Sequence, residues 1–135
     1  MMEKLALLAW LEEATDAGLS FGRFCLQMQA EELEMDEAEL QRQLQESLSV
    51  MRHAIDYGLS GVRSTGGLTG GTGRLLKNRS VDPDDVSGLL GPLPAKAAAY
   101  ALAASEANAA MVRICAAPTA GSSGVLPGVL FAIAE

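Results

Sequence analysis

The chain has 135 residues, 49% of them hydrophobic, which is enough to bury the core of one domain. Only 4% of the residues are aromatic, whereas glycine occurs 14 times, and small side chains allow backbones to approach closely. This composition favours tightly packed helices over a β-sandwich. The net charge of −7 argues against a nucleic-acid partner, because binding to phosphate backbones depends on clustered Lys and Arg.

Neither the cysteines nor the apolar segments indicate a secreted or membrane protein. Cys25 and Cys115 are far apart in sequence, so they form neither a CxxC redox pair nor a zinc motif, and we expect no disulfide framework. The N-terminus lacks the basic and apolar stretches of a signal peptide. The longest apolar run, residues 125–134, is about half of the roughly 20 residues that a membrane span needs. We therefore expect a cytoplasmic protein without a membrane partner.

Three amphipathic helices are predicted in the first part of the chain. Apolar residues at helical spacing indicate a helix over residues 3–17, and a second is predicted over residues 20–33. The third begins at Asp36, since Glu39 follows at the spacing of a capping box. Its apolar positions recur over twenty residues and comprise Leu40, Leu44, Leu48, Met51, Ile55 and Leu59.

A glycine-rich stretch follows the third helix. Six glycines fall within residues 61–73, and no regular element tolerates so many well, so we predict a loop over residues 61–74. Its exposed N–H groups and hydroxyls could hold a carboxylate or phosphate, and the alternative is a flexible linker. It contains neither a P-loop nor a GxGxxG pattern, so nucleotide binding is not indicated.

The second half of the chain combines two breaks with one long helix. Residues 82–85 predict a turn or helix start, residues 91–94 a break, and residues 95–115 an alanine-rich helix. If this helix is enclosed by protein, Glu106 and Asn108 need hydrogen-bond partners or a ligand, because an unpaired buried polar group costs about 1–3 kcal/mol. The alternative is that both side chains face water.

A second turn of small polar residues precedes the apolar C-terminal segment. Residues 119–124 lead into a helix predicted over residues 126–135, and the N-terminus of a helix attracts anions. The alternative is that Ser122 or Ser123 is merely the N-cap of that helix.

Three segments carry a resemblance to a known family. They read Ser-Thr-Gly-Gly-Leu-Thr-Gly-Gly at 64–71, Tyr-Ala-Leu-Ala at 100–103 with Glu-Ala-Asn-Ala at 106–109, and Cys-Ala-Ala-Pro-Thr-Ala-Gly-Ser-Ser-Gly-Val-Leu-Pro-Gly at 115–128. In this order and spacing they closely resemble the α chain of the iron–sulfur L-serine dehydratases, and the likeness runs from about residue 20 to the end. Two departures are Ser105, where the family usually has Asn, and Val112, where it has a small residue.

The resemblance implies an activity, a cofactor and a set of site residues. The family deaminates L-serine to pyruvate and ammonia in an all-helical catalytic domain, with a [4Fe–4S] cluster whose open iron can act as a Lewis acid toward the substrate hydroxyl. The substrate-binding candidates carried over are Thr65, Gly66 and Gly67 in the first turn, Asn108 on the helix, and Thr119, Ala120 and Gly121 in the second turn. No catalytic base is identified.

The fold expected from this resemblance is an all-α, multi-helix domain with two Gly/Ser/Thr-rich turns, forming the N-terminal half of a larger helical catalytic domain. The family's cluster cysteines lie in the half that would follow Glu135, and two cysteines are too few for a cluster, which needs at least three thiolates when one iron is open. We therefore expect no cluster bound to this chain alone and no activity from it alone.

The expected partners are L-serine, a β chain and the missing C-terminal half of the α chain. We also expect self-association through the apolar C-terminal segment. The alternative function is a non-enzymatic helical module that retains the glycine-rich turns for anion binding or protein interaction.

Overall fold

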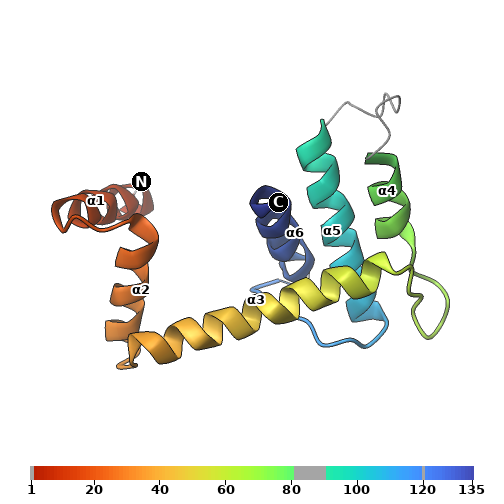
Figure 1. Cartoon of the computed structure of the whole chain (residues 1–135), viewed down its shortest axis with the longest axis horizontal. Coiled ribbons are helices and arrows are strands. Elements are labelled where there is room, and N and C mark those ends of the chain that lie inside the picture. The colour runs from red at the N-terminus through yellow and green to blue at the C-terminus, as the bar shows by residue number, and fades with distance from the viewer. Residues whose placement is uncertain (1, 81–90, 120) are drawn as a thin grey trace. The chain divides into compact units, whose positions relative to one another are not determined.

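The chain is all-α. The computed structural model describes residues 2–80, 91–119 and 121–135, and these residues form six α-helices and no strand, apart from one isolated bridge between Arg63 and Gly70 (Figure 1). The predicted fold class is therefore confirmed. The chain divides into two compact units, Met1–Gln45 and Glu46–Glu135, and the turn predicted over residues 82–85 lies outside the described residues.

The first unit contains the helices predicted from the amphipathic pattern. Helix α1 spans Met2–Asp16, α2 spans Phe21–Glu32, and α3 spans Glu37–Leu59 and continues into the second unit. Helix α1 packs against α2.

Local caps explain where α2 and α3 begin. The Ser20 hydroxyl accepts a hydrogen bond from the Arg23 amide at 3.3 Å, and the Asp36 carboxylate accepts one from the Ala38 amide at 3.0 Å. These side chains satisfy amide groups that have no partner within the first turn of a helix. The starts of both helices were therefore predictable from short sequence patterns.

The second unit contains a helix that the sequence analysis missed and two with different bounds. Helix α4 spans Thr72–Ser80, so it begins inside the stretch predicted as a loop up to residue 74. Helix α5 spans Pro92–Ala109 rather than residues 95–115, and α6 spans Ser122–Ala134 rather than beginning at residue 126. Proline suits the first turn of a helix because its missing N–H would have no partner there.

The early end of α5 follows from the backbone at Met111. This residue has a φ of 66°, in the left-handed region, and its amide donates to the Asn108 carbonyl at 2.9 Å. A non-glycine residue with this φ does not continue a right-handed helix. Cys115 therefore lies in the segment after α5 rather than within the helix.

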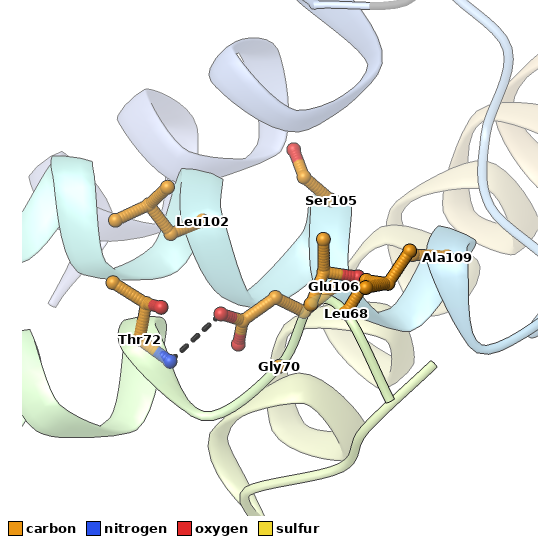
Figure 2. Close-up of a pocket in the computed structure, with 8 residues that line it drawn as sticks. Leu68, Gly70, Thr72, Leu102, Ser105, Glu106 and Ala109 are labelled. Atoms are coloured by element: carbon orange, nitrogen blue, oxygen red, sulfur yellow. Dashed lines mark hydrogen bonds between the residues drawn. The ribbon is translucent and has the colours of Figure 1, made fainter. Parts of the chain in front are cut away.

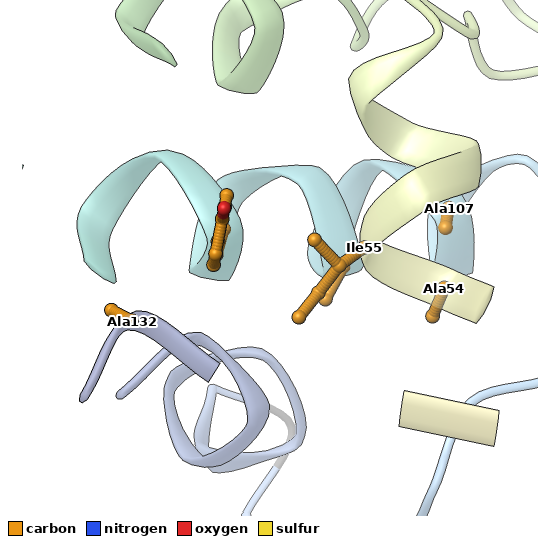
Figure 3. Packing of buried hydrophobic residues seen from close by; sticks show 6 residues of the cluster. Ala54, Ile55, Ala107 and Ala132 are labelled. Atoms are coloured by element: carbon orange, nitrogen blue, oxygen red, sulfur yellow. The ribbon is translucent and has the colours of Figure 1, made fainter. Parts of the chain in front are cut away.

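The core of the second unit lies where α3, α5 and α6 meet (Figure 3). Ile55 is fully buried, and Ala54, Ala107 and Ala132 surround it with small side chains. Burial of apolar surface contributes about 25 cal/mol per Å², so a core of alanines must rely on many close contacts rather than on a few large side chains. This explains the low aromatic content.

Two glycines allow neighbouring helices to touch the backbone of α5. A Cβ placed on Gly58 of α3 would lie 1.9 Å from the Ala103 carbonyl oxygen, and one on Gly73 of α4 would lie 2.7 Å from the Ala103 nitrogen. Since real Cβ contacts are not this short, both positions require glycine. Helix α5 is therefore approached on two sides at the level of one alanine.

A polar cluster joins α5 to the end of α6. The Tyr100 hydroxyl donates to the Glu135 carboxylate at 2.7 Å, and the same carboxylate pairs with Arg52 and with Lys96. Burial and the bond to Glu135 raise the pKa of Tyr100 to about 12. The hydrogen bond from Tyr100 and the pairing with Arg52 lower the pKa of Glu135 below its ordinary value.

We predict a loss of stability at alkaline pH that depends on Tyr100. The pKa of Tyr100 in the folded state is about 12, above the ordinary value of about 10. The contribution of Tyr100 to the free energy of unfolding is therefore complete below pH 10 and is lost as the pH rises toward 12. Urea unfolding of the wild type and of Tyr100→Phe, at about pH 8 and about pH 11, measures how much of the alkaline loss of stability depends on Tyr100. If both proteins lose the same free energy of unfolding between these pH values, the assignment to Tyr100 is wrong.

Helix α6 exposes an apolar surface in the second unit. Five of its large side chains are at least 41% exposed: Val125, Leu126, Val129, Leu130 and Ile133. A contiguous apolar surface of this kind promotes association, so we predict that the isolated chain forms dimers or larger species whose mass by light scattering rises with concentration. Ile133→Asp, at the most exposed of the five, should shift the distribution toward the monomer. A concentration-independent monomer mass for the wild type would contradict this prediction.

No helix in the described part of the chain is both long and apolar enough to cross a membrane.

Candidate functional site

The glycine-rich stretch forms a closed turn between α3 and α4. The Ser64 amide donates to the Thr69 carbonyl at 2.8 Å, and the Ser64 hydroxyl accepts from the Thr69 amide at 3.2 Å. Gly67, at the tip, has a φ of 69°, which favours glycine, and Leu68 beside it is 92% exposed. These bonds form a folded turn, which is not the structure expected of a flexible linker.

A buried carboxylate caps the helix that follows this turn. Glu106 of α5 is only 7% exposed, and its Oε1 accepts a hydrogen bond from the Thr72 amide at 2.7 Å (Figure 2). The Gly73 amide lies 3.4 Å from both carboxylate oxygens. Because Thr72 and Gly73 begin α4, Glu106 satisfies two amides of the first turn and complements the positive end of the helix dipole.

An open pocket of about 330 Å³ lies between the glycine-rich turn and α5 (Figure 2). It is lined by residues 68–70 and Thr72 from the turn side, and by Leu102, Ser105, Glu106 and Ala109 from α5. Leu102 and the other apolar groups form its walls, and Glu106 is the one charged side chain among these lining residues. The pocket can therefore hold a small polar molecule beside a carboxylate.

The residues predicted from the sequence lie near this pocket in the chain but do not line it. Thr65, Gly66 and Gly67 are exposed at the tip of the turn, and Asn108 is exposed on α5. Of the two alternatives for α5, enclosure therefore holds for Glu106, and exposure to water holds for Asn108.

The second predicted turn folds through the side chain of Thr119. Its hydroxyl accepts from the Ser122 amide at 3.1 Å and donates to the Ser122 hydroxyl at 2.9 Å. Ser122 and Ser123 are the first two residues of α6 and Gly121 is its N-cap, so the alternative that Ser122 or Ser123 is the N-cap is wrong. Thr119 and Gly121 are exposed, and Ala120 lies outside the described residues.

The sequence analysis missed the residues that line the pocket from the turn. Residues 68–70 and Thr72 follow the predicted Thr65, Gly66 and Gly67 in the chain, and residues 68–70 belong to the same eight-residue segment. The signal that could have identified them is the position of Thr72 at a helix start, but α4 itself was not predicted.

The cysteines do not fit a [4Fe–4S] cluster. Cys25 is in α2 and Cys115 follows α5, so they belong to different units, and no group of three or more His, Cys, Asp or Glu suited to a metal occurs among the described residues. A cluster of this type is held by cysteine thiolates, at least three when one iron is open. The described residues therefore do not form a cluster site on their own.

Comparison with known proteins identifies the family. Residues 16–135 match the family described as "Serine dehydratase alpha chain". The chain is 45% identical over 111 residues to the "Probable L-serine dehydratase, alpha chain" of Bacillus subtilis (strain 168), which covers 80% of this chain and 36% of that protein. It is 53% identical over 47 residues to the "L-serine dehydratase, alpha chain" of Peptoniphilus asaccharolyticus, which covers 35% of this chain and 16% of that one.

These matches are partial with respect to the relatives. The chain spans about a third of the length of the Bacillus subtilis protein, against the half expected from its sequence. No solved structure matches the chain significantly. Because the family match covers nearly all of the chain after α1, including both turns and α5, the chain belongs to the serine dehydratase alpha chain family.

Proposed function

We propose that this chain supplies part of the substrate pocket of an L-serine dehydratase, an enzyme that converts L-serine to pyruvate and ammonia. The observation that carries the proposal is the pocket itself. It lies between the 64–71 turn and the α5 segment, and both belong to the region that matches the serine dehydratase alpha chain family.

The reaction determines which groups of the substrate such a pocket must bind. L-Serine brings a carboxylate and an ammonium group that must be fixed, a Cα proton to be removed and a β-hydroxyl to be expelled. Fixing the two charged groups aligns the Cα–H and Cβ–O bonds and lowers the entropic cost of reaction. The chain offers polar backbone and hydroxyl groups in two turns and one buried carboxylate, Glu106, for this binding.

The substrate carboxylate is proposed to bind to the exposed polar groups of the two turns. A Cβ on Gly66 or Gly67 would meet nothing within 4 Å, so the backbone at the tip is open to a ligand. The Gly67 amide already donates to the Ser64 carbonyl at 2.8 Å, so the Gly66 amide is the one proposed to bind the carboxylate. Thr65 adds a hydroxyl at the same tip. The other proposed substrate-binding residues do not line the pocket and are Asn108, Thr119, Ala120 and Gly121.

The cluster and a β chain are proposed to come from outside these 135 residues. This chain resembles the α chain of the iron–sulfur L-serine dehydratases. Its two cysteines do not form a cluster site on their own. We therefore propose that the chain is inactive alone and acts when it is assembled with the remaining α-chain segment and the β chain.

A substitution at the tip of the first turn tests this proposal. Thr65 is exposed, so Thr65→Ala should leave the fold intact and raise the KM for L-serine about tenfold in the assembled enzyme, the loss expected for one hydrogen bond to a charged group. The assay is anaerobic pyruvate formation. Asn78→Ala, at an exposed position of α4 away from the pocket, is the matched control and should leave KM unchanged. Equal KM values for both variants would remove the turn from the substrate site.

A further inference from the structure

We infer that the pocket between the glycine-rich turn and α5 binds the ammonium group of an amino-acid substrate, with the Glu106 carboxylate as its acceptor. The inference rests on the proposed function, since it takes the substrate to be an amino acid. It assigns one of the two charged groups of that substrate to a particular place in the fold.

The charge of the pocket selects a cation. Glu106 is the one charged side chain among the eight lining residues, and its burial, at 7% exposure, keeps it poorly screened by solvent. A ligand carboxylate in this pocket would face another carboxylate without a basic side chain to offset the repulsion. An ammonium group would instead gain a charge-assisted hydrogen bond.

The hydrogen bonds of Glu106 leave one oxygen available. Oε1 accepts the short bond from the Thr72 amide at 2.7 Å (Figure 2), whereas Oε2 has only the long contact of 3.4 Å with the Gly73 amide. A carboxylate offers about four lone-pair sites, so Oε2 can accept a further hydrogen bond. The bond to Thr72 holds the carboxylate in place while Oε2 receives the ligand.

The same geometry closes the N-terminus of α4 to anions. The first two amides of that helix already donate to Glu106, so they are not free for a substrate carboxylate. This separates the two charged groups of the substrate, because the ammonium binds at Glu106 and the carboxylate must bind elsewhere. At the tip of the turn, the Gly67 amide donates to the Ser64 carbonyl at 2.8 Å, so the amide of the exposed Gly66 is the one assigned to the carboxylate.

Two truncated substrates distinguish this arrangement in the assembled enzyme. Ethanolamine keeps the ammonium and hydroxyl groups of serine, and 3-hydroxypropanoate keeps the carboxylate and hydroxyl groups. Glu106→Gln retains an oxygen acceptor for the Thr72 amide but has no charge. We expect this variant to weaken ethanolamine binding, measured by calorimetry, and to raise the KM for L-serine, each about tenfold or more. Its inhibition constant for 3-hydroxypropanoate should stay within about twofold of the wild type.

A second pair of variants keeps the test decisive if Glu106→Gln fails to fold. Ala109 is exposed, lines the pocket and lies three residues after Glu106 on α5, so a lysine there can place its own ammonium near the carboxylate. Ala109→Lys should abolish ethanolamine binding, whereas Ala109→Met, of similar length without charge, should weaken it far less. Equal losses for both variants would mean that the pocket is merely blocked, and would overturn the inference.

The outcomes separate this inference from the proposed function. Serine turnover by the wild-type assembly together with unchanged ethanolamine binding in Glu106→Gln would reject the ammonium pocket and leave the dehydratase proposal intact. Ethanolamine binding that depends on Glu106 in an assembly without serine turnover would reject the dehydratase proposal and leave the ammonium pocket intact.

Discussion

Gly58→Ala is expected to destabilise the second unit by about 3 kcal/mol or more, the upper range for overpacking in a close-packed interior. The added Cβ would lie 1.9 Å from the Ala103 carbonyl oxygen and 2.4 Å from its carbon. Both are backbone atoms of α5, so no side-chain rotation relieves the contact. Helices α3 and α5 would have to separate, and the contacts of Ile55 and the alanines around it would be lost as well.

Urea unfolding, followed by circular dichroism, measures this effect. Gly22→Ala is the comparison variant, because Gly22 lies in the first turn of α2, in the first unit, and a Cβ there meets nothing within 4 Å. Alanine is favoured over glycine in helices by about 0.5–1 kcal/mol, so this control should be neutral or more stable than the wild type. A Gly58→Ala variant as stable as Gly22→Ala would show that α3 does not approach α5 this closely.

Glu106→Ala is expected to cost about 2–3 kcal/mol of stability, since it removes the cap of α4 and leaves the buried Gly73 amide without its partner. The Thr72 amide would lose its 2.7 Å bond, and the Gly73 amide, in a buried residue, would lose both of its contacts. The turn that precedes α4 should loosen as well. Amide hydrogen exchange should therefore accelerate over residues 69–76 more than in α6.

Glu106→Gln distinguishes the capping role of this side chain from the role of its negative charge. Glutamine keeps one carbonyl oxygen for the Thr72 amide, so most of the stability lost in Glu106→Ala should be retained, while binding of an ammonium ligand is not. If Glu106→Ala unfolds at the same urea concentration as the wild type, then Glu106 does not hold α4.

The first three helices were predictable because their signals are local. Ser20 and Asp36 stand next to the helices that they cap, and the apolar positions of α3 recur at helical spacing up to Leu59. Such patterns need no knowledge of distant residues.

Helix α4 was not predictable in this way, because its support comes from far along the chain. Its second residue is Gly73, which local propensity disfavours in a helix, yet this glycine is what lets α4 touch the backbone of α5 at Ala103. Its cap is Glu106, 34 residues after Thr72. Tertiary contacts override propensity here.

The sequence predicted the segments that form the candidate site, but not the residues that line its pocket. Glu106 and Asn108 are two residues apart on α5, so they point in directions about 200° apart around the helix, and one is buried where the other is exposed. The family resemblance pointed to Asn108 as a site residue, whereas the residue of this pair that lines the pocket is Glu106. Which side of α5 faces the turn depends on how α4 packs, and this was not readable from the sequence.

The central claim is that this chain carries substrate-binding elements of a serine dehydratase and works only in an assembly. Anaerobic pyruvate formation from L-serine tests it most directly, measured for the 135-residue chain alone after treatment with iron and sulfide, and for the chain combined with the remaining α-chain segment and the β chain. We predict no pyruvate from the chain alone, and turnover from the assembly that falls when Thr65 is replaced by alanine. Turnover by the chain alone, or an assembly without activity toward L-serine, would contradict this account.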